Sequence, residues 1–365
     1  MATLKLLFLI NGSKASAAGI RAEMFAANLP KSWEIRFNYR PTSKWKGILP
    51  FIQSAIRFQP DIIYVMDTAY TGVLAGCIAR KMLDCKLITD TGDVACELAK
   101  STGRYSAKQL ALIHWIEQLA MNQSDALVVR GSHHKLWLEQ QGIYSATFVP
   151  DGVDTSVIKP MDTTTSKAEL GLDKSLVVGL VGTMAWSKHH QMCYGWDIVE
   201  ALAFLKDAPV KALLVGDGDG RSVLEQRAEQ LGISDRIVFT GQLPYEQLPQ
   251  YISAMDVCIS TQSNDLVGMV RTTGKLPLYL AYGRYVIATD VGEARRVLPG
   301  VGWLLPYEGV RDDRHPARLA DHLKLLLAEP GRLQVTTAAR DVAQKNFDYK
   351  LLANRVERLA QTLLK

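Results

Sequence analysis

Residues 270–283, VRTTGKLPLYLAYG, combine residue types that bind phosphate. A loop of small residues and a lysine precede an apolar stretch, and helix starts of this kind offer backbone N–H groups and a positive dipole end to anions. The stretch is not a nucleoside triphosphate loop. Five residues separate Gly268 from Gly274, where that motif has four, and Leu276 stands where it needs a magnesium-binding hydroxyl. A phosphate held here would therefore belong to another class of ligand.

Other polar clusters give weaker indications. The glycines of GDGDGR (216–221) alternate and lack the dinucleotide-binding spacing. Asp217 and Asp219 resemble a metal-binding pair, but helix capping is the favoured interpretation. Adjacent histidines at 133–134 and 189–190 diverge on any regular element, so neither pair is expected to bind metal. The five cysteines form no C-x-x-C pair, which favours reduced core thiols in a cytosolic protein.

The elements that must position these residues alternate between short β-rich runs and amphipathic stretches. Strands are expected at 5–10, 61–66, 85–89, 125–129, 146–150, 175–182, 210–216, 236–241, 256–261, 285–290 and 302–306. Helices are expected at 18–29, 69–83, 107–123, 220–232, 245–255, 275–283 and 349–365. Apolar strands without polar alternation indicate parallel sheets covered on both faces. The pattern predicts an α/β protein of two doubly wound, Rossmann-like domains facing across a cleft, joined near residues 150–170.

Length and composition agree with two globular domains. Single cores seldom grow beyond roughly 250–300 residues, and this chain has 365 residues, 48% of them hydrophobic and 22% charged. No apolar run approaches the length of a membrane span. The run at residues 6–10 is shorter than the apolar core of a secretory signal, so a first buried strand is favoured there.

The net charge of +5 is concentrated in the first 160 residues. Basic and large apolar residues interleave near the start, namely Lys31, Trp33, Arg36, Arg40, Lys44, Trp45, Lys46, Phe51, Ile52 and Arg57. A solvated surface over ordinary core aromatics is one interpretation. A patch facing anionic lipid or an anionic acceptor is the other, which makes peripheral contact with the inner face of a membrane an expectation. Nucleic acid is disfavoured because no recognition motif accompanies the charge.

The order of signals along the chain resembles a known family. FVPDGVDTSVIKP (148–160), VGLVGTM (178–184), LLVGDGDGR (213–221), IVFTGQLP (237–244) and GKLPLYLAYGRYVIATDVGE (274–293) follow one another with the spacing of retaining glycosyltransferase family 4. The resemblance implies the two-Rossmann, B-type (GT-B) fold. It implies an acceptor-binding domain at 1–160, a nucleotide-sugar-binding domain at 161–344, and a helix at 345–365 that packs back toward the N-terminal domain.

The same resemblance implies a donor site. Backbone donors and cations would stabilise the negative charge that develops on the departing nucleoside diphosphate, without a metal or other cofactor. Arg271, Lys275 and Lys188 would supply the cations. The remaining donor contacts are expected from Gly182, Thr183, Gly241, Gln242, Leu243, Asp265, Thr272, Thr273, Gly274 and Leu278. For Arg271 and Lys275 a solvated turn, and for Lys188 an exposed loop, remain the alternatives.

Several positions depart from the family pattern. The family carries two glutamates eight positions apart, for the sugar and the ribose, where this chain has Val270 and Leu278. Neither side chain can accept a hydrogen bond. An arginine-rich subgroup of pattern R-x-x-x-K followed by Y-x-A-x-G matches better, and there Arg271 and Lys275 take over part of the donor contact. Thr183 replaces a family arginine, and Gly92 replaces a family histidine.

Acceptor-side residues are expected in the first domain. Asp93 is retained from the family pattern and is expected in the catalytic site, and Asp90 could bind acceptor or sugar hydroxyls. Helix capping is the alternative for both. Ser16 and Gly19 resemble the loop that lets the acceptor approach the diphosphate, with a tight helix start as the alternative. Ser132 follows a strand at its ligand-binding edge.

Together these features predict a cytoplasmic glycosyltransferase. It would move a sugar from a nucleotide diphosphate-sugar to a glycan, lipid-linked or small-molecule acceptor, with retention of configuration and without metal. A catalytically degenerate binding protein of the same fold is the first alternative, because of Val270, Leu278, Gly92 and Thr183. A nucleotide-sugar epimerase is the second, and it is disfavoured because few acid/base residues are available.

Overall fold

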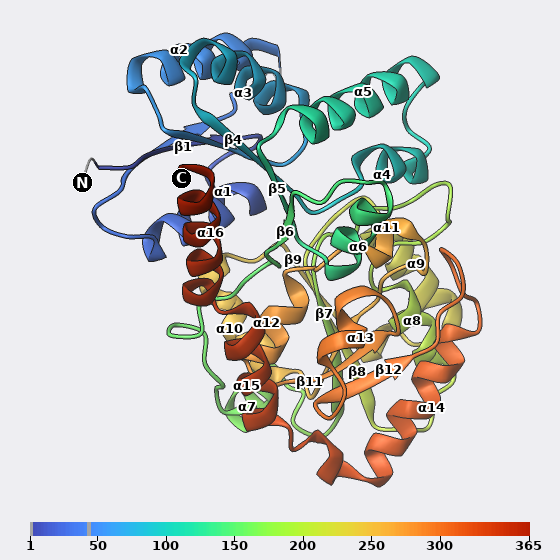
Figure 1. Cartoon of the computed structure of the whole chain (residues 1–365). Coiled ribbons are helices and arrows are strands. Elements are labelled where there is room, and N and C mark those ends of the chain that lie inside the picture. The colour runs from blue at the N-terminus through green and yellow to red at the C-terminus, as the bar shows by residue number, and fades with distance from the viewer. Residues whose placement is uncertain (1–2, 42–44) are drawn as a thin grey trace. The chain divides into compact units, whose positions relative to one another are not determined.

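The computed structural model describes residues 3–41 and 45–365. The chain divides into two compact units, one of Met1–Asp154, Val270–Thr272 and Phe347–Lys365, the other of Thr155–Met269 and Thr273–Asn346. Each unit contains a six-stranded parallel sheet with helices on its faces (Figure 1). The predicted α/β fold with two doubly wound sheets is therefore confirmed. None of the described helices has both the length and the hydropathy that a membrane span requires.

The sheet of the first unit has the strand order β2-β1-β3-β4-β5-β6. Its strands are β1 (Lys5–Ile10), β2 (Glu34–Tyr39), β3 (Ile62–Met66), β4 (Lys86–Thr91), β5 (Ala126–Val129) and β6 (Ala146–Phe148). Sequence analysis missed β2. This edge strand pairs only with β1 and alternates polar Glu34, Arg36 and Asn38 with apolar residues, so it lacks the continuous apolar run of a central strand.

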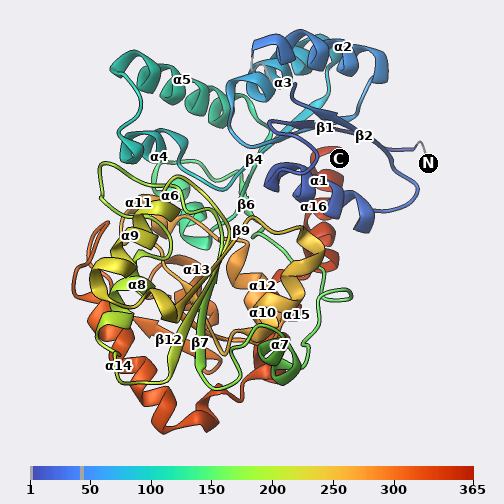
Figure 2. The same ribbon diagram turned by 180° about the vertical axis from the view of Figure 1, so that it is seen from behind.

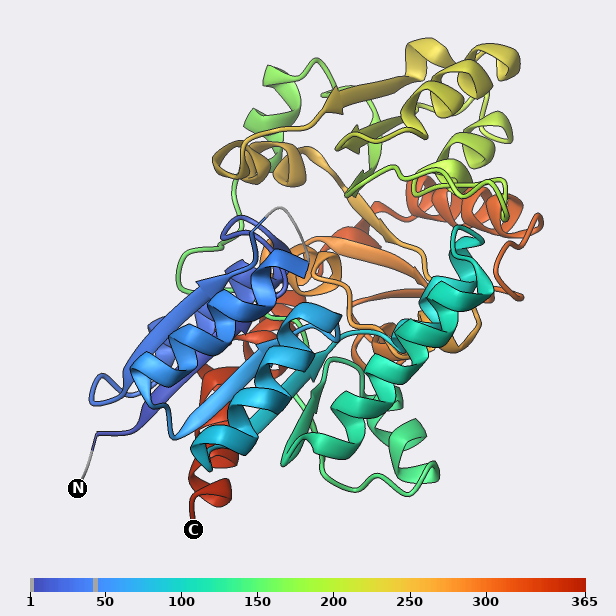
Figure 3. The same cartoon turned by 90° about the horizontal axis from the view of Figure 1, so that it is seen from above.

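Helices cover both faces of this sheet. Helix α1 (Ala17–Asn28) and the last helix α16 (Tyr349–Leu363) pack together on one face, where Phe25 and Leu352 join a core with Phe8 and Tyr64 (Figure 2). Helices α2 (Ile48–Phe58), α3 (Tyr70–Leu83) and α5 (Ala107–Gln123) lie side by side on the other face (Figure 3). Helices α4 (Ala95–Thr102) and α6 (Ser132–Gln140) follow the ends of β4 and β5.

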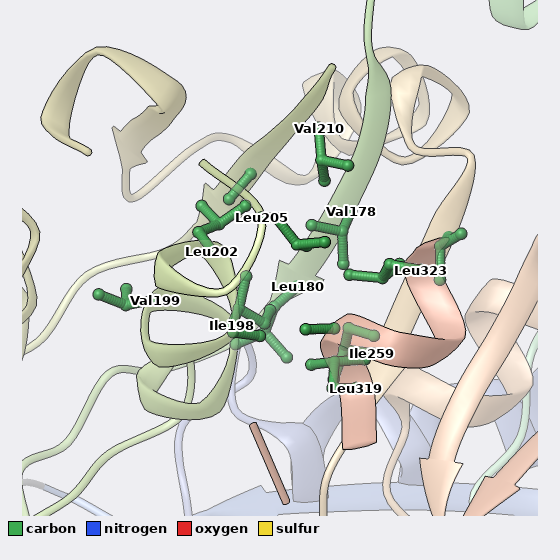
Figure 4. Packing of buried hydrophobic residues seen from close by; sticks show 14 of the residues in the cluster. Val178, Leu180, Ile198, Val199, Leu202, Leu205, Val210, Ile259, Leu319 and Leu323 are labelled. Atoms are coloured by element: carbon green, nitrogen blue, oxygen red, sulfur yellow. The ribbon is translucent and has the colours of Figure 1, made fainter. Parts of the chain in front are cut away.

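The sheet of the second unit has the strand order β12-β11-β10-β7-β8-β9. Its strands are β7 (Leu176–Val181), β8 (Val210–Val215), β9 (Ile237–Gly241), β10 (Val257–Ser260), β11 (Tyr285–Thr289) and β12 (Gly302–Leu305). One face is covered by α8 (Trp196–Ala203), α9 (Arg221–Leu231) and α14 (His315–Ala328). Figure 4 shows Val178 and Leu180 of β7 packed against α8 and α14. All six strands were predicted from their apolar runs, although the edge strands β9 and β12 are partly exposed, with Val238 and Trp303 among the exposed residues.

Shorter helices complete this unit. Helices α10 (Leu248–Ala254) and α12 (Lys275–Ala281) contact the central strands. The remaining helices of this unit are α7 (Thr163–Glu169), α11 (Leu266–Met269), α13 (Gly292–Val297) and α15 (Thr336–Phe347). Among the described residues, single 3₁₀ turns lie at 45–47 in the first unit and at 234–236, 245–247 and 330–333 in the second.

Three histidines are buried in the cores. His134 in the first unit and His315 and His322 in the second are each less than a tenth exposed. Burial lowers the pKa of each to about 4, because an apolar environment disfavours the charged imidazolium. Neither ring nitrogen of His134 has a hydrogen-bond partner among the described residues. The folded protein therefore holds these rings neutral well below their ordinary pKa of 6.5.

Stability should fall as the pH drops from about 6.5 to 4. In this window the histidines of the unfolded chain bind protons, whereas the buried histidines of the folded protein stay neutral. Each buried histidine therefore lowers the free energy of unfolding at pH 5 by on the order of 1–2 kcal/mol relative to neutral pH. Urea unfolding midpoints measured between pH 7.5 and 4.5 test this. His322→Gln should flatten the acid loss relative to the wild type, whereas His114→Gln, at an exposed position, should leave it unchanged. Equal acid loss in both variants would contradict the assignment.

Candidate functional site

A pocket of about 680 Å³ opens at the carboxyl ends of β7, β8 and β9 in the second unit. This is the edge at which parallel α/β sheets bind ligands. The pocket is lined by Val181, Gly182, Thr183, Val215, Gly216, Asp217, Gly218, Asp219, Gln242, Leu243 and Leu248. Four of the predicted donor residues, Gly182, Thr183, Gln242 and Leu243, are thus brought together. A fifth, Gly241, ends β9, and its carbonyl accepts the Gly216 N–H at 3.0 Å.

The pocket depends on a close approach of two loops. Gly216 has φ +134°, and a Cβ there would overlap the carbonyl oxygen of Gly182. Met184 N–H donates to the Asp217 carbonyl at 2.9 Å, and Gly220 N–H donates to the Met184 carbonyl at 2.8 Å. Only glycine at position 216 permits this contact, which keeps the loop after β8 against the loop after β7.

The aspartates of GDGDGR support these loops. Asp219 Oδ1 accepts the Trp186 N–H at 2.7 Å, and Asp217 Oδ1 accepts the Gly218 N–H at 2.8 Å. The predicted capping role is wrong, because α9 begins after Gly220 without a side-chain cap. Backbone geometry at the two glycines already shapes the turn, which leaves the carboxylates to brace it.

Lys275 lies beside this pocket. It begins α12, and its Nζ lies 3.4 Å from the position that a Cβ on Gly182 would occupy. The same Nζ is 3.3 Å from the ring centroid of Tyr194, a cation–π contact that holds the ammonium group in place. A positive charge is therefore fixed next to the glycine loop. Helix α12 has only seven residues, so its dipole adds less than this charge does.

Tyr279 is a positioning residue that sequence analysis missed. It is fully buried on α12, and its hydroxyl accepts the Val181 N–H at 2.8 Å. This bond ties α12 to the last residue of β7, directly before Gly182. The tyrosine of the Y-x-A-x-G pattern was visible in the sequence, but its partner depends on how α12 packs on the sheet.

The other predicted donor residues lie outside this pocket lining. Asp265 Oδ1 accepts the Gly268 N–H at 2.9 Å and caps the start of α11. Thr273 and Gly274 precede α12, and Leu278 lies half-buried on it. Lys188 is exposed on a loop closed by the Ser187–Met192 bridge. Their predicted contacts with a donor stay predictions.

A buried ion network occupies the carboxyl ends of β3, β4 and β5 in the first unit. Asp90 is fully buried and accepts from Arg21 Nε at 3.0 Å, Arg130 Nε at 2.8 Å and the Tyr64 hydroxyl at 3.0 Å. Burial alone would raise the pKa of Asp90, but the two guanidinium groups lower it below its usual value. Arg130 also donates to Asp67 at 2.6 Å. Both oxygens of Asp90 therefore have protein partners, although this residue was predicted to bind hydroxyls.

Arg271 and Asp93 form an ion pair in the first unit. Their side chains are 28% and 32% exposed. The neighbouring Thr272 hydroxyl donates to the Arg130 carbonyl, and a Cβ on Gly131 would overlap the Val270 carbonyl, so residues 270–272 lie against the end of β5. Helix α4 has no side-chain cap, so Asp93 does not cap it. Two residues predicted to contact substrates thus contact each other.

Other predicted acceptor-side residues shape turns. Ser16 is the N-cap of α1, and its hydroxyl accepts the Gly19 N–H at 3.2 Å. A Cβ on Gly19 would overlap the carbonyls of Ser13 and Lys14, as a tight helix start requires. Ser132 is the first residue of α6. These placements match the structural alternatives, and the predicted substrate contacts stay predictions.

A second pocket of about 780 Å³ lies within the first unit. Its polar end includes Asp67, Thr68, Thr91 and Asp93, at or just beyond the ends of β3 and β4. Its other wall is apolar and is built by α4 and α5. The lining there includes Leu98, Ala99, Thr102, Tyr105, Gln109, Leu112, Ile113 and Ile116.

Among the described residues, one group of side chains could hold a metal ion. The ligand atoms of Cys96, His114 and Glu117 lie within 4.8 Å of one another. Glu117 already accepts the Ala95 N–H at the start of α4, and the Cys96 thiol keeps a raised pKa through burial. A structural role for Glu117 in joining α4 to α5 accounts for its position.

The basic region near the N-terminus is less of a patch than its sequence suggests. Arg36 lies 4.4 Å above the ring of Phe58 and pairs with Glu34. Phe51 is buried, and Trp33 packs against the core. Lys44 lies outside the described residues. Trp33 and Phe51 therefore serve the core, whereas Trp45 is 58% exposed.

Comparisons with known proteins agree with this geometry. Residues 175–329 match the family described as "Glycosyl transferases group 1". A 2-deoxystreptamine glucosyltransferase of Streptomyces kanamyceticus is 35% identical over 127 residues, 33% of this chain and 31% of that protein. A D-inositol 3-phosphate glycosyltransferase of Segniliparus rotundus is 30% identical over 56% of this chain and 44% of that protein. The chain thus aligns with less than half the length of these curated relatives.

The similarity in fold to solved structures covers nearly the whole of both chains. The chain is similar to Anabaena HepE in complex with UDP-glucose, with a TM-score of 0.77, 18% identity and 99% coverage of both chains. At this identity the likeness concerns the fold. It confirms the predicted GT-B architecture, and the family match confirms the predicted resemblance to glycosyltransferases for residues 175–329.

Gly216→Ala should disrupt the pocket of the second unit. The added Cβ would overlap the Gly182 carbonyl, and the backbone conformation at 216 disfavours any side chain. We therefore expect the free energy of unfolding, measured by urea titration, to fall by about 2–4 kcal/mol. Gly232→Ala is the matched control, because Gly232 also has positive φ (68°) but no described atom within 4 Å of its Cβ position. The control substitution should lower the free energy of unfolding by about 1 kcal/mol. Equal losses would show that φ alone, and not the loop contact, requires glycine at 216.

Asp90→Asn should destabilise the first unit far more than Asp93→Asn. Removing the Asp90 charge leaves Arg21 and Arg130 buried without a full counter-charge, at a cost of about 3–5 kcal/mol. Asp93 is a third exposed, so losing its charge should cost less than about 1 kcal/mol. Unfolding midpoints of the two variants provide the comparison. Similar midpoints would show that the Asp90 network contributes little.

Proposed function

We propose that this chain, whose residues 175–329 belong to the glycosyl transferases group 1, transfers a sugar from a nucleotide diphosphate-sugar to a hydroxyl acceptor. The pocket at the ends of β7–β9, with Lys275 beside its glycine loop, carries the proposal. A volume of about 680 Å³ is within the range of small-molecule sites and suits a nucleotide-sugar. The similar fold of HepE, whose structure contains UDP-glucose, supports a donor of this class.

The donor's diphosphate would lie against the loop of residues 182–184. Glycine at 182 lets the backbone approach a ligand closely, and the ammonium of Lys275 provides a fixed charge for the phosphate oxygens. Negative charge increases on the leaving diphosphate during transfer, so a preorganised cation lowers the barrier more than it strengthens ground-state binding.

The chemistry needs little further machinery. In a front-face reaction the leaving phosphate accepts the proton of the attacking hydroxyl, and the new bond forms on the face that the leaving group vacates. Configuration at the anomeric carbon is then retained. We propose this course, with Lys275 in place of a metal ion. Sequence analysis assigns Arg271 and Lys188 as further cations, and these remain proposals.

The acceptor would bind in the pocket of the first unit. Asp67 and Asp93 at its polar end can accept hydrogen bonds from hydroxyl groups. We place the activity in the cytoplasm, where nucleotide-sugars are made and where five free, buried cysteines would remain reduced. Contact with a membrane surface draws little support from the basic region, because Phe51 is buried, Trp33 packs against the core, and Trp45 is the exposed aromatic residue among the three.

A panel of UDP-, GDP-, ADP- and TDP-sugars tests this function through thermal shift and release of free nucleotide. Binding with slow hydrolysis, accelerated by an acceptor, is expected for one base. Binding without nucleotide release under any acceptor would instead establish a degenerate binding protein. No shift with any donor would refute the donor site.

Lys275→Met should weaken donor binding by roughly 10- to 100-fold, because it removes a charge-assisted contact while keeping most of the side-chain volume. Calorimetric titration with the donor from the panel measures the effect, and near-normal thermal unfolding verifies the fold. Lys324→Met, at an exposed position on α14, is the control and should bind as the wild type does. Equal affinity in both variants would mean that Lys275 does not contact the donor.

A further inference from the structure

The charged residues that line the pocket of the first unit disfavour anionic acceptors. Among the described residues that line it, Arg130 is the one basic side chain, and its guanidinium already binds Asp90 and Asp67. Asp67 and Asp93 add negative charge at the same end. Arg271 is not part of the lining, and it binds Asp93. An anionic acceptor would meet two carboxylates there without an available cation in the lining, at an electrostatic cost.

The opposite wall offers apolar and aromatic surface. Leu98 and Ala99 of α4 face the pocket together with Leu112, Ile113 and Ile116 of α5. Leu112 is 37% exposed although it is apolar. Such a wall gains free energy when a ligand covers it, in proportion to the apolar area removed from water.

An aromatic platform stands in the same lining. Trp45 is 58% exposed, and its ring lies against that of Tyr70, with centroids 4.3 Å apart and the planes tilted by 30°. Tyr105 adds a third aromatic ring, 44% exposed. Flat, partly exposed rings held by a neighbour bind ring-shaped ligands at low entropic cost. A sugar ring or an aryl group suits them equally.

We propose that this pocket takes an uncharged acceptor with two ends, a hydroxylated end at Asp67 and Asp93 and an apolar, ring-bearing part against Trp45 and the α4–α5 wall. This rests on the proposed function, and it narrows the acceptor class to neutral, apolar glycosides and cyclic alcohols. Phosphorylated sugars and phosphorylated cyclitols fall outside this class. Arg40 acts electrostatically on Tyr70 but is not among the residues that line the pocket.

Three matched probes test the proposal by direct binding without a donor. 4-Nitrophenyl β-D-glucopyranoside carries both ends, 4-nitrophenyl β-D-glucuronide adds one negative charge, and D-glucose lacks the apolar part. Saturation-transfer NMR titration of the full chain should rank the neutral glycoside at least about tenfold above the other two. Equal or tighter binding of the glucuronide, or of inositol phosphate, would overturn the charge argument. Equal binding of glucose, or no binding of the neutral glycoside, would overturn the apolar argument.

Two variants locate the binding. Trp45→Ala and Leu112→Glu should each weaken binding of the neutral glycoside by at least about fivefold, because each removes apolar contact area. Trp115→Ala is the control, since Trp115 is 51% exposed on the same helix α5 but does not line the pocket. All three positions are exposed, so folding should be preserved. Unchanged affinity in the first two variants would refute the site.

This result can be separated from the outcome for the proposed function. Nucleotide release from the sugar panel reports on the donor site of the second unit, whereas the glycoside titration needs no donor. Binding of the neutral glycoside without nucleotide release would support the pocket and refute the transferase. Nucleotide release without binding of the neutral glycoside would support the transferase and refute the pocket assignment.

Discussion

One buried carboxylate organises the ligand edge of the first unit. Asp90 binds Arg21, Arg130 and Tyr64, which come from a helix and two neighbouring strands. A charge in this position is tolerated only because it is fully paired, and its partners are equally dependent on it. Arg130 in turn positions two further residues. Its guanidinium binds Asp67 at the pocket, and its backbone carbonyl accepts a hydrogen bond from the Thr272 hydroxyl. The polar end of the pocket, which includes Asp67 and Arg130, is thus held in place by the buried Asp90 beneath it.

In the second unit, backbone contacts between two loops, in place of buried charges, hold the ligand edge of the sheet. Gly182 and Gly216 come so close that no side chain fits between their loops, and successive hydrogen bonds from Met184 and Gly220 hold them. Tyr279 fixes the neighbouring α12 through the N–H of Val181, one residue before the glycine loop. This arrangement leaves backbone groups facing a pocket, with one lysine beside them. Such a surface suits a phosphorylated ligand, in the same way that the carboxylates of the first unit suit hydroxyl groups.

Local patterns in the sequence were sufficient for most of the fold. Central strands such as β7 and β8 are continuous apolar runs, whereas the edge strand β2 alternates and was missed. Residue types at the site were also predictable, because Gly182 and Lys275 follow from a motif order. Their partners were not. Arg21 and Asp90 lie 69 residues apart and Asp93 and Arg271 lie 178 apart, so their pairing depends on strand order, which no local pattern records.

The ion network around Asp90 and the ion pair of Asp93 with Arg271 differ in how readily a ligand could exchange with them. Asp90, Arg21 and Arg130 are almost fully buried, so separating their charges would cost several kcal/mol. These ion pairs therefore have a structural role. Asp93 and Arg271 are each about a third exposed, and a pair of that kind contributes about 1 kcal/mol or less. Oxygen atoms of a substrate can compete with a contact of that strength. Asp93 and Arg271 therefore hold each other in place weakly enough for a ligand to compete with their contact, and their predicted roles toward substrates stay predictions.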